Sequence, residues 1–521
     1  MHKYLLTTIL LSLIALGQVQ AIEFNPLSYG LNDARNGVER YQSLLHCHED
    51  AVMKGAKVSY RGIDTIKIEI PHSFKTIPLT SETDFAGCVI TVVNRAKNVF
   101  LFSMVNNVSP IVVPASCIDK AQFEAVPELS KGNHLLSISD KNKWVSRRLG
   151  HDYGHIRRDV VLITDGKGSN KPVMPYDNPN SIAECEYCEV SLSKKVIENL
   201  VFLRDPQSTK VCNLCDVNYQ NNVLIRNISV TTPSKTGIVA DKLFRIHNST
   251  NITFENLRIQ GTYSDVRKYG YAFNLNNVWN HIARNVYADA IWGVYGNNNI
   301  NTATLMNCNL NNFEIHCYGR DITSHNCTYH DKYNHFASTY GTIKYENCIF
   351  TNTIPHMNAN SYNSYVPVDI EFTNCTFNIR KKGKLTSFAK IYGLTDSINQ
   401  RPELSKKCLP NFRLRHCTFN IDKNIRNWYF INFMKVDYKK NLGYMSKISL
   451  SDITINGDAE FDLFTCPIET EKPVDVEFDN INVVNKGRKR KFEMLSATMG
   501  RRMKFKVNGK KVRERKFIPK R

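Results

Sequence analysis

The chain has 521 residues, of which 42% are hydrophobic, and its formal net charge at pH 7 is +20. This length is ample for a large hydrophobic core, in one long domain or in several. Beyond the amino terminus no stretch is apolar enough to form a membrane helix. A strongly basic protein attracts polyanions, which include nucleic acid, anionic lipid and acidic polysaccharide.

The first 21 residues have the pattern of a secretory signal peptide. Lys3 is followed by an apolar run over residues 5–16, and a small-residue cleavage site ends at Ala21. The run is too short to span a bilayer. We therefore expect a mature chain that begins near Ile22, is secreted or periplasmic, and does not insert into a membrane. Outside the cytoplasm, acidic polysaccharide is the expected polyanionic partner, and nucleic acid is not.

Residues 22–180 are predicted to form an N-terminal cap and the first coils of a repeat fold. Apolar residues recur at helical spacing between Asn36 and Met53, and Gly55 then ends the helix. Strands are expected over residues 58–70 and 88–105. A helix at this end would cover the core that the first coil of a solenoid otherwise exposes.

Residues 181–485 repeat one pattern: apolar, any, apolar, any, Asn or Asp, then Cys, Leu or Ile, any, apolar. The residue after the Asn or Asp marks each copy: Leu200, Ile228, Leu257, Val286, Cys308, Cys327, Cys348, Cys375, Cys417, Ile453 and Ile481. Most markers are 19 to 29 residues apart, which is the length of one β-solenoid coil. Two longer intervals imply inserted loops or an unrecognised coil. The pattern predicts an all-β chain that forms a right-handed parallel β-helix with an N-terminal helical cap.

This repeat assigns places to its cysteines and asparagines. Alternation along a strand sends every second residue inward, and stacked coils place like residues on like. The marker cysteines should therefore form a buried column that packs as small hydrophobic residues rather than as disulfides or metal ligands. Asn tolerates the left-handed conformation that a bend between strands needs, so the preceding asparagines should form a side-chain ladder.

Two CxxC motifs, Cys185 with Cys188 and Cys212 with Cys215, leave alternatives open. Their spacing is compatible with a structural zinc site. However, the two segments align with each other at about one coil, which favours stacked core cysteines or disulfides. Carboxylates near the candidate site are too few to suggest a calcium cage. We therefore expect no cofactor.

Residues 486–521 form a strongly basic C-terminal cap or tail, with sixteen Lys or Arg against two Glu. Asn508-Gly509 within this segment predicts a hairpin turn. The segment either binds polyanions or serves only as a solvated, cationic end.

The densest group of reactive and aromatic residues lies within residues 263–365. If Phe313 and Ile315 point inward, Glu314 and His316 point outward on one strand. Sugar-binding surfaces use flat aromatic rings beside polar groups. The residues predicted to bind substrate are Trp292, Tyr295, Asn298, Tyr318 and His356.

Residues of about 240–377 resemble a bacterial, pectate-lyase-like β-helix family. Its members carry a Trp-Gly-x-x-Gly-x-Asn segment, then Arg-Phe-Asp-Ala-His and Arg-x-Asp-Tyr-Gly segments. The matching positions of the first two segments are Trp292, Gly293, Gly296, Asn298, Phe313 and His316. Glu314 takes the Asp position and Asn312 replaces Arg; in the third segment Tyr362 fits, but Ala359 and Ser361 replace Arg and Asp. The resemblance implies a polysaccharide lyase.

A lyase removes the proton beside a uronate carboxylate and expels the glycosidic oxygen, so it needs a base, a cation and an acid. We assign His316 as the base, Arg320 as the cation and Tyr340 or Tyr318 as the acid, with Glu314 beside them. A β-helix polygalacturonase is disfavoured because the chain has no Asp-Asp pair. We therefore predict a monomeric lyase of acidic polysaccharide, with glycosaminoglycan favoured. A glycoside hydrolase or a non-catalytic glycan-binding protein on the same fold remains the alternative.

Overall fold

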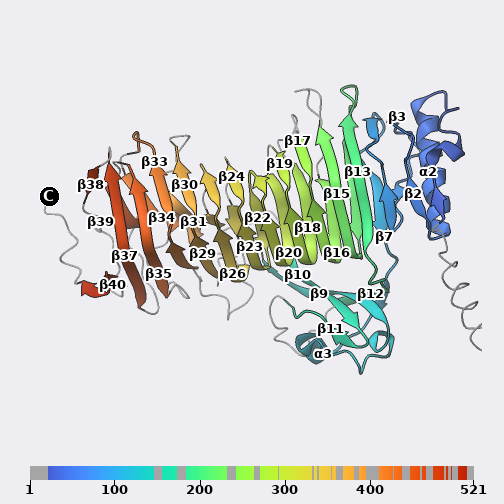
Figure 1. The fold of residues 1–521 in the computed structure, drawn as a ribbon. Coiled ribbons are helices and arrows are strands. Elements are labelled where there is room, and N and C mark those ends of the chain that lie inside the picture. Colours follow the sequence, from blue (N-terminus) through green and yellow to red (C-terminus); the bar gives the residue numbers. More distant parts are fainter. Residues whose placement is uncertain are drawn as a thin grey trace, which may run out of the picture.

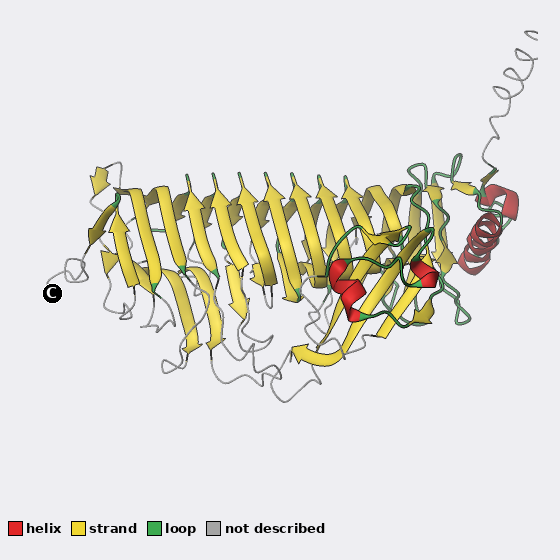
Figure 2. Cartoon of the chain, turned by 90° about the horizontal axis from the view of Figure 1, so that it is seen from below, coloured by secondary structure: helices red, strands yellow, loops and turns green. Residues whose placement is uncertain are grey.

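The computed structural model describes residues 22–145, 155–172, 184–231, 242–262, 270–290, 293–330, 334–336, 339–353, 355–358, 368–380, 387–394, 410–425, 427–436, 446–457, 460–464, 473–485, 488–490, 494–495 and 503–512. The described strands form a 36-stranded sheet, wound into a right-handed parallel β-helix, and a separate 5-stranded sheet (Figures 1 and 2). The predicted fold class is therefore confirmed. The signal peptide predicted over residues 1–21 lies outside the described residues. Among the described helices, none has the length and apolar character needed to span a membrane.

The β-helix has three faces, each built from parallel strands of successive coils. Face 1 contains β2 (Lys57–Ser59), β5 (Glu82–Asp84), β23 (Gly319–His325), β26 (Thr339–Glu346), β29 (Val368–Thr373), β32 (Asn411–Arg415) and β40 (Met503–Val507), with β1 (Glu23–Phe24) paired to β2. Face 2 contains β3 (Thr65–Glu69), β6 (Val89–Val93), β17 (Arg258–Thr262), β19 (Tyr287–Ala290), β21 (Asn309–Leu310), β24 (Thr328–His330), β27 (Ile349–Thr351), β30 (Thr376–Ile379) and β33 (Thr418–Ile421). Face 3 contains β4 (Ile77–Pro78), β7 (Val99–Val105), β14 (Cys212–Asn218), β22 (Phe313–Cys317), β25 (Asn334–Phe336), β28 (Pro355–Asn358), β31 (Ser387–Leu394), β34 (Asn427–Val436), β36 (Glu460–Phe464) and β39 (Met494–Leu495).

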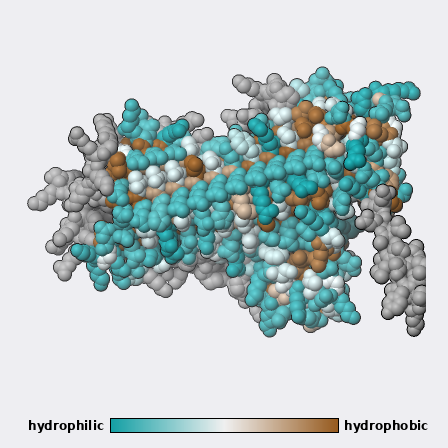
Figure 3. All heavy atoms as spheres, in the orientation of Figure 1, coloured by the Kyte–Doolittle hydropathy of each residue, from teal (hydrophilic) through white to brown (hydrophobic). Residues whose placement is uncertain are grey.

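Several longer strands bend across a corner and so belong to two faces. Those that join faces 1 and 2 are β13 (Lys195–Arg204), β15 (Asn221–Thr231), β35 (Lys447–Asn456) and β37 (Val474–Asn485). Those that join faces 3 and 1 are β16 (Lys242–Glu255), β18 (Tyr271–Arg284) and β20 (Gly293–Met306). The outer surface in Figure 3 carries a continuous hydrophilic band along the length of this solenoid.

The N-terminal end is covered by α2 (Gly37–Met53), which follows the short η1 (Pro26–Tyr29). Asn36 caps the helix by accepting a hydrogen bond from the Glu39 backbone N–H at 2.9 Å. Gly55, with φ of 59°, takes the left-handed conformation just after the helix. Leu44 and Ala51 are completely buried against the first coil. The predicted helical cap is confirmed.

An asparagine ladder runs along the corner between faces 1 and 2. Its members have φ near +54°, a conformation that Asn tolerates better than most residues. Along most of the ladder an amide donates to the amide oxygen one coil earlier, as in Asn227 to Asn199 at 2.9 Å and Asn256 to Asn227 at 3.1 Å. The ladder that the repeat predicted is therefore confirmed.

The marker cysteines lie directly inside this corner. Cys308, Cys327, Cys348, Cys375 and Cys417 are buried and free. Each thiol donates to the carbonyl oxygen two residues earlier, at 3.2–3.3 Å. A thiol is therefore both small enough for the stack and able to satisfy a corner carbonyl. The prediction that these cysteines pack in the core is confirmed.

An accessory sheet is inserted in the chain between β7 and β13 of the β-helix. It contains β8 (Ser109–Ile111), β9 (Asn133–Val145), β10 (His155–Thr164), β11 (Lys167–Gly168) and β12 (Glu184–Glu189), with α3 (Ala115–Lys120) and η2 (Pro127–Leu129). All of its strand pairs are antiparallel. It lies against the β-helix beside β16, β18 and β20 (Figure 1). Within the range predicted as cap and first coils, the described residues 109–145 and 155–172 therefore belong to this sheet and its connections.

Polar contacts hold the accessory sheet on the β-helix. The Arg158 backbone N–H donates to Asn299 Oδ1 at 2.9 Å, and Asn277 Nδ2 donates to Ser137 Oγ at 3.1 Å. Within the accessory sheet, Arg157 of β10 lies between Asp140 of β9 and Asp159 of β10, with a nitrogen 3.9 Å from each carboxylate, and all three side chains are buried. Buried charges need partners of opposite sign.

The two CxxC motifs lie in different sheets. Cys185 and Cys188 are on β12 of the accessory sheet, whereas Cys212 and Cys215 are on β14 inside the β-helix. All four are buried. The prediction that they stack in successive coils is wrong, because β12 pairs with β8 and β9 rather than with a coil.

At the C-terminal end, β40 and β41 (Lys510–Val512) form an antiparallel hairpin. Asn508 and Gly509 have φ of 47° and 73°, as a type I′ turn requires. The predicted hairpin is confirmed. The short strand β38 (Arg488–Arg490) folds back on β37.

Two buried histidines each form a hydrogen bond with a buried tyrosine. His281 Nδ1 is 3.1 Å from the carbonyl oxygen of Ile252, and His281 Nε2 is 3.1 Å from the hydroxyl of Tyr295. Because a carbonyl oxygen only accepts, Nδ1 carries the proton and Nε2 accepts from the tyrosine. His48 contacts Pro78 and Tyr60 in the same way. Burial lowers the pKa of His48 and of His281 to about 4.

The ladder predicts a difference between two substitutions of Asn285, whose φ is 53° and whose amide donates to Asn256 at 3.0 Å. Both Asn285→Gly and Asn285→Ala remove the amide, but only alanine is strained at positive φ. We expect alanine to lower the free energy of unfolding by about 1 kcal/mol more than glycine does. Denaturant unfolding of both variants measures this difference, and equal values would contradict the conformational role.

The buried histidines predict a loss of stability at acidic pH. Their pKa is near 6.5 when unfolded and about 4 when folded, so the unfolded chain binds more protons between these values. The free energy of unfolding should fall from pH 6.5 towards pH 4, by up to about 3 kcal/mol for each histidine. In His281→Gln the fall should be smaller by that amount. An unchanged pH profile would show that His281 is not buried in its neutral form.

Candidate functional site

The strand β22, which carries the Glu314 and His316 candidates, has an irregular register at the middle of face 3. Asn297 of β20 pairs with Ile315, but the next residue, Asn298, pairs with Cys317. His316 is therefore the extra residue of a β-bulge. Bulges redirect a side chain and are frequent beside active sites. Glu314 and His316 lie together on the outer side of the sheet, as their alternation with the buried Phe313 and Ile315 requires.

Three polar atoms meet at this bulge. His316 Nε2 is 3.1 Å from Glu314 Oε2, and the hydroxyl of Tyr271 donates to the same Oε2 at 3.1 Å. The hydroxyl is also 3.2 Å from His316 Nε2. We call Tyr271, Glu314 and His316 the face 3 triad. Its side chains are largely shielded, with 8% of His316 and 15% of Glu314 exposed.

A glycine creates the space for the tyrosine ring of the triad. A Cβ atom built on Gly296 would lie 2.6 Å from three ring atoms of Tyr271. Any side chain at this position would therefore displace the ring. Gly296 pairs with Glu314 in the next coil, and Asn274 Nδ2 donates to the Gly296 carbonyl oxygen at 2.6 Å. These contacts fix the position of β20, the strand on which the Tyr271 ring packs.

On face 3, basic residues occupy the positions that follow Glu314 in register in the next coils. Ile315 pairs with Phe336, so His335 follows Glu314 one coil on. His335 pairs with His356, which pairs with Lys390. The strands therefore place three basic residues at successive positions along the helix axis. The side chains of His335 and His356 lie outside the described residues.

The placement of Glu314 and His316 on one strand face, close together, is confirmed. However, the face is not the open surface that was predicted, because Tyr271 and the neighbouring coil cover His316. Their catalytic roles stay predictions. The hydrogen-bond partners of His316 include Glu314 and Tyr271.

Two aromatic residues predicted to bind substrate are buried. Tyr295 is completely inaccessible, packs on Phe273 and Phe313, and donates its hydroxyl to His281. It points inward because it alternates with Gly296, the outward residue of β20. Tyr318 is 2% exposed at a corner with φ of 54°. Burial raises the pKa of Tyr318 well above its usual range, with Arg157 and Asp140 among its charged neighbours. Neither ring lies on a surface that can stack on a sugar.

The remaining predicted residues lie around the triad. Asn298 accepts a hydrogen bond from the Cys317 thiol at 3.3 Å, directly beside the bulge. Arg320 pairs in register with Tyr340 on face 1, beyond the corner at Tyr318. The Arg320 guanidinium donates to Asp321 at 3.1 Å and to the Pro172 carbonyl oxygen at 3.4 Å. Trp292 lies outside the described residues.

Tyr271 and Gly296 were not among the predicted site residues. Tyr271 is 43 residues before Glu314 in sequence and meets it only because the coils of β18, β20 and β22 stack in succession. Gly296 could have been noticed, since it matches the second glycine of the Trp-Gly-x-x-Gly-x-Asn segment. Its role could not be predicted, because the tyrosine ring that packs on it comes from another coil. Within the described parts of the chain, no three His, Cys, Asp or Glu side chains cluster as a metal site would require.

Comparison with solved structures supports the architecture. The tailspike of Acinetobacter baumannii bacteriophage AP22, solved in complex with capsular saccharide, is similar with a TM-score of 0.61 and 10% identity, over 93% of this chain and 79% of that one. The tailspike of Pseudomonas phage phi297 is similar with a TM-score of 0.51 and 10% identity, over 88% of this chain and 80% of that one. At such identities the similarity shows the fold alone.

No family model matches the chain, and no curated protein matches it in sequence. The resemblance to a pectate-lyase-like family therefore stays a prediction.

The site geometry predicts that Gly296→Ala displaces the Tyr271 ring, since the added carbon would lie 2.6 Å from it. A crystal structure of this variant should show the hydrogen bond from Tyr271 to Glu314 broken, whereas Tyr271→Phe should leave the ring in place. If the Tyr271 ring is unmoved in Gly296→Ala, the glycine is not what seats it.

Proposed function

We propose that this protein is a secreted polysaccharide lyase that cleaves an acidic, uronate-containing polysaccharide by β-elimination at the face 3 triad. Glycosaminoglycan is the favoured substrate. The observation that carries the proposal is the hydrogen-bonded cluster of Tyr271, Glu314 and His316 at a β-bulge on the outer side of face 3.

The triad contains the proton donors and acceptors that elimination needs. His316 takes the proton from the carbon beside the uronate carboxylate, a carbon–carbon double bond forms, and the glycosidic bond breaks. Tyr271 gives its hydroxyl proton to the leaving oxygen. The imidazolium can then return a proton to the phenolate across the 3.2 Å contact between Nε2 and the hydroxyl. Glu314 stabilises the imidazolium at 3.1 Å.

This assignment changes the acid predicted from sequence. Tyr318 is buried and Tyr340 lies on face 1, whereas the Tyr271 hydroxyl contacts both other members of the triad. The carboxylate of the substrate also needs a cation. His335 and His356 follow Glu314 in the register and supply basic residues along the axis. Arg320 is less suited because Asp321 already neutralises it at 3.1 Å.

Elimination fits the triad better than hydrolysis does. Glycoside hydrolases of the usual kind use two carboxylates on opposite sides of the scissile bond. The triad instead joins a single carboxylate to an imidazole and a phenol. A non-catalytic glycan-binding role leaves the shielded proton network without a purpose.

The class of substrate is supported by charge and by fold. The net charge of +20 favours a polyanion outside the cell. The similar tailspike of bacteriophage AP22 was solved with capsular saccharide, so this architecture accommodates a polysaccharide in at least one case. We propose that the protein acts as a monomer and without a cofactor.

Single substitutions in the triad should separate activity from stability. His316→Ala should lower turnover of acidic glycans by about 10²–10⁴, the usual contribution of a general base. Tyr271→Phe, which keeps the ring and removes only the hydroxyl, should have an effect of similar size. Turnover is followed by the ultraviolet absorbance of the unsaturated product on a panel of acidic glycans.

The matched control is His325→Ala, because His325 pairs with Glu346 at 2.8 Å on face 1 and should keep full turnover. Melting temperatures check that each variant is folded. Wild-type turnover in His316→Ala would remove His316 from the mechanism. New reducing ends without ultraviolet absorbance would instead favour the hydrolase.

A further inference from the structure

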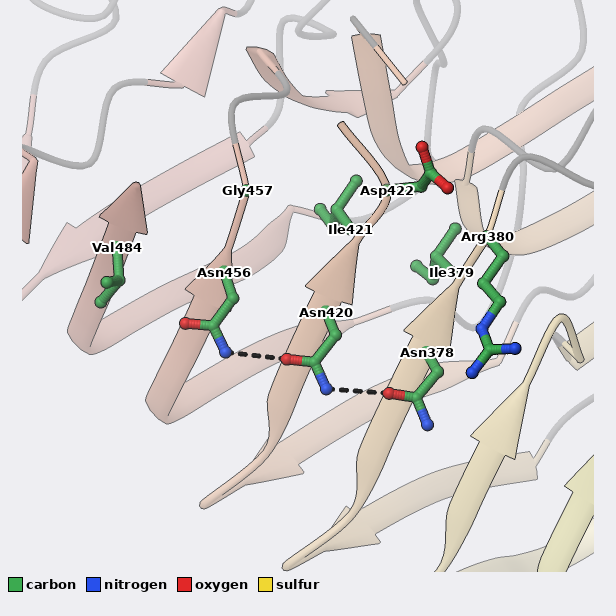
Figure 4. Close-up of a pocket in the computed structure, with 9 residues that line it drawn as sticks. All are labelled: Asn378, Ile379, Arg380, Asn420, Ile421, Asp422, Asn456, Gly457 and Val484. Carbon is green, nitrogen blue, oxygen red and sulfur yellow. Dashed lines mark hydrogen bonds between the residues drawn. The ribbon is translucent and has the colours of Figure 1, made fainter. Parts of the chain in front are cut away.

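A hollow of about 510 Å³ lies on face 2, where β30, β33, β35 and β37 end (Figure 4). The triad is on face 3, so this hollow is a separate site. Its volume is in the range of pockets that hold small ligands. Neither the triad nor the accessory sheet contributes to its lining.

Three amides from successive coils line the hollow. Asn456 Nδ2 donates to Asn420 Oδ1 and Asn420 Nδ2 donates to Asn378 Oδ1, both at 2.8 Å. An amide has two N–H donors and two acceptor lone pairs, and a ladder bond uses one of each. Every rung therefore keeps one donor and one acceptor for a ligand. Adjacent hydroxyl groups of a sugar ring match such a pair.

The ladder ends open within the hollow. Asn456 pairs in register with Val484, whose side chain has no amide that could donate to the Asn456 oxygen. In Figure 4 the Asn456 oxygen points towards Val484, and no further ladder bond follows. The side-chain oxygen of Asn456 therefore receives no ladder hydrogen bond and is available to water or a ligand.

The rest of the lining adds a small apolar area and little net charge. Val484 supplies the apolar surface on which the C–H face of a sugar can pack, whereas Ile379 and Ile421 border the hollow but are buried in the core. Arg380 and Asp422 border the hollow with one charge of each sign. Gly457, with φ of 147°, adds no side chain to fill it. The site therefore favours a neutral ligand rich in hydroxyl groups.

We infer that this hollow binds a neutral segment of a polysaccharide, with the glycan running along the helix axis across Asn378, Asn420 and Asn456. Successive rungs are about 4.8 Å apart, as neighbouring strands are. This spacing is close to the length of a sugar ring. The glycan inferred here is uncharged, unlike the acidic substrate proposed for the triad, so the inference does not rest on the proposed function.

Isothermal titration of the full chain with neutral hexasaccharides, one of β-1,4-linked glucose and one of β-1,4-linked N-acetylglucosamine, tests the inference. At least one should bind, with an affinity unchanged between low and high salt because the site has little net charge. Asn456→Val should raise the Kd by about tenfold, as the loss of one or two hydrogen bonds does.

Asn482→Val is the matched control, because Asn482 lies on face 2 one coil further on and does not line the hollow. It should bind as the wild type does, and equal melting temperatures should show that both variants are folded. His316→Ala should also bind normally, which separates this site from the triad. Absence of binding by the wild type, wild-type affinity in Asn456→Val, or equal weakening in Asn482→Val would overturn the inference.

Discussion

The stacking of like residues in register is the constraint on which the whole structure depends. Each coil must place its corner where the previous coil placed it, because a shift of one residue would turn every side chain to the other side of the sheet. Asn227 and Asn256 fix this register at the corner by hydrogen bonds between amides at positive φ. The column that includes Cys327 and Cys348 fills the space directly inside. Backbone hydrogen bonds alone would allow neighbouring coils to slip.

Once the register is fixed, each outer face can carry a different chemistry. On face 1 charged residues pair between coils, as Arg226 does with Glu198 at 2.6 Å. Face 2 carries neutral amides such as Asn420, and face 3 carries the triad around His316. Paired charges stabilise the scaffold and leave few polar groups for a ligand. The other two faces present amides with hydrogen-bonding capacity to spare or groups that can transfer protons. The accessory sheet docks beside face 3 through Asn277.

The local pattern was enough to predict the coils, the corner ladder and the C-terminal hairpin, because each depends on the spacing of a few neighbouring residues. It was also enough to place Glu314 and His316 on one side of a strand. It could not identify the accessory sheet, since the alternation around Cys185 resembles that of a true coil and does not reveal its strand partner. The local pattern also assigned Tyr295 to the surface and missed Tyr271. The direction of the Tyr295 ring and the position of the Tyr271 ring both depend on packing between coils, which the local pattern does not contain.

We propose that the face 3 triad cleaves an acidic glycan by proton transfer alone, with Glu314 stabilising the positive charge that develops on His316. Elimination and hydrolysis break the same bond but differ by one water molecule in the product. Mass spectrometry of the oligosaccharides released by the wild-type protein measures this difference directly. Our account predicts new non-reducing ends that are lighter by one water than the hydrolysis products, and products with the full mass of hydrolysis would contradict it.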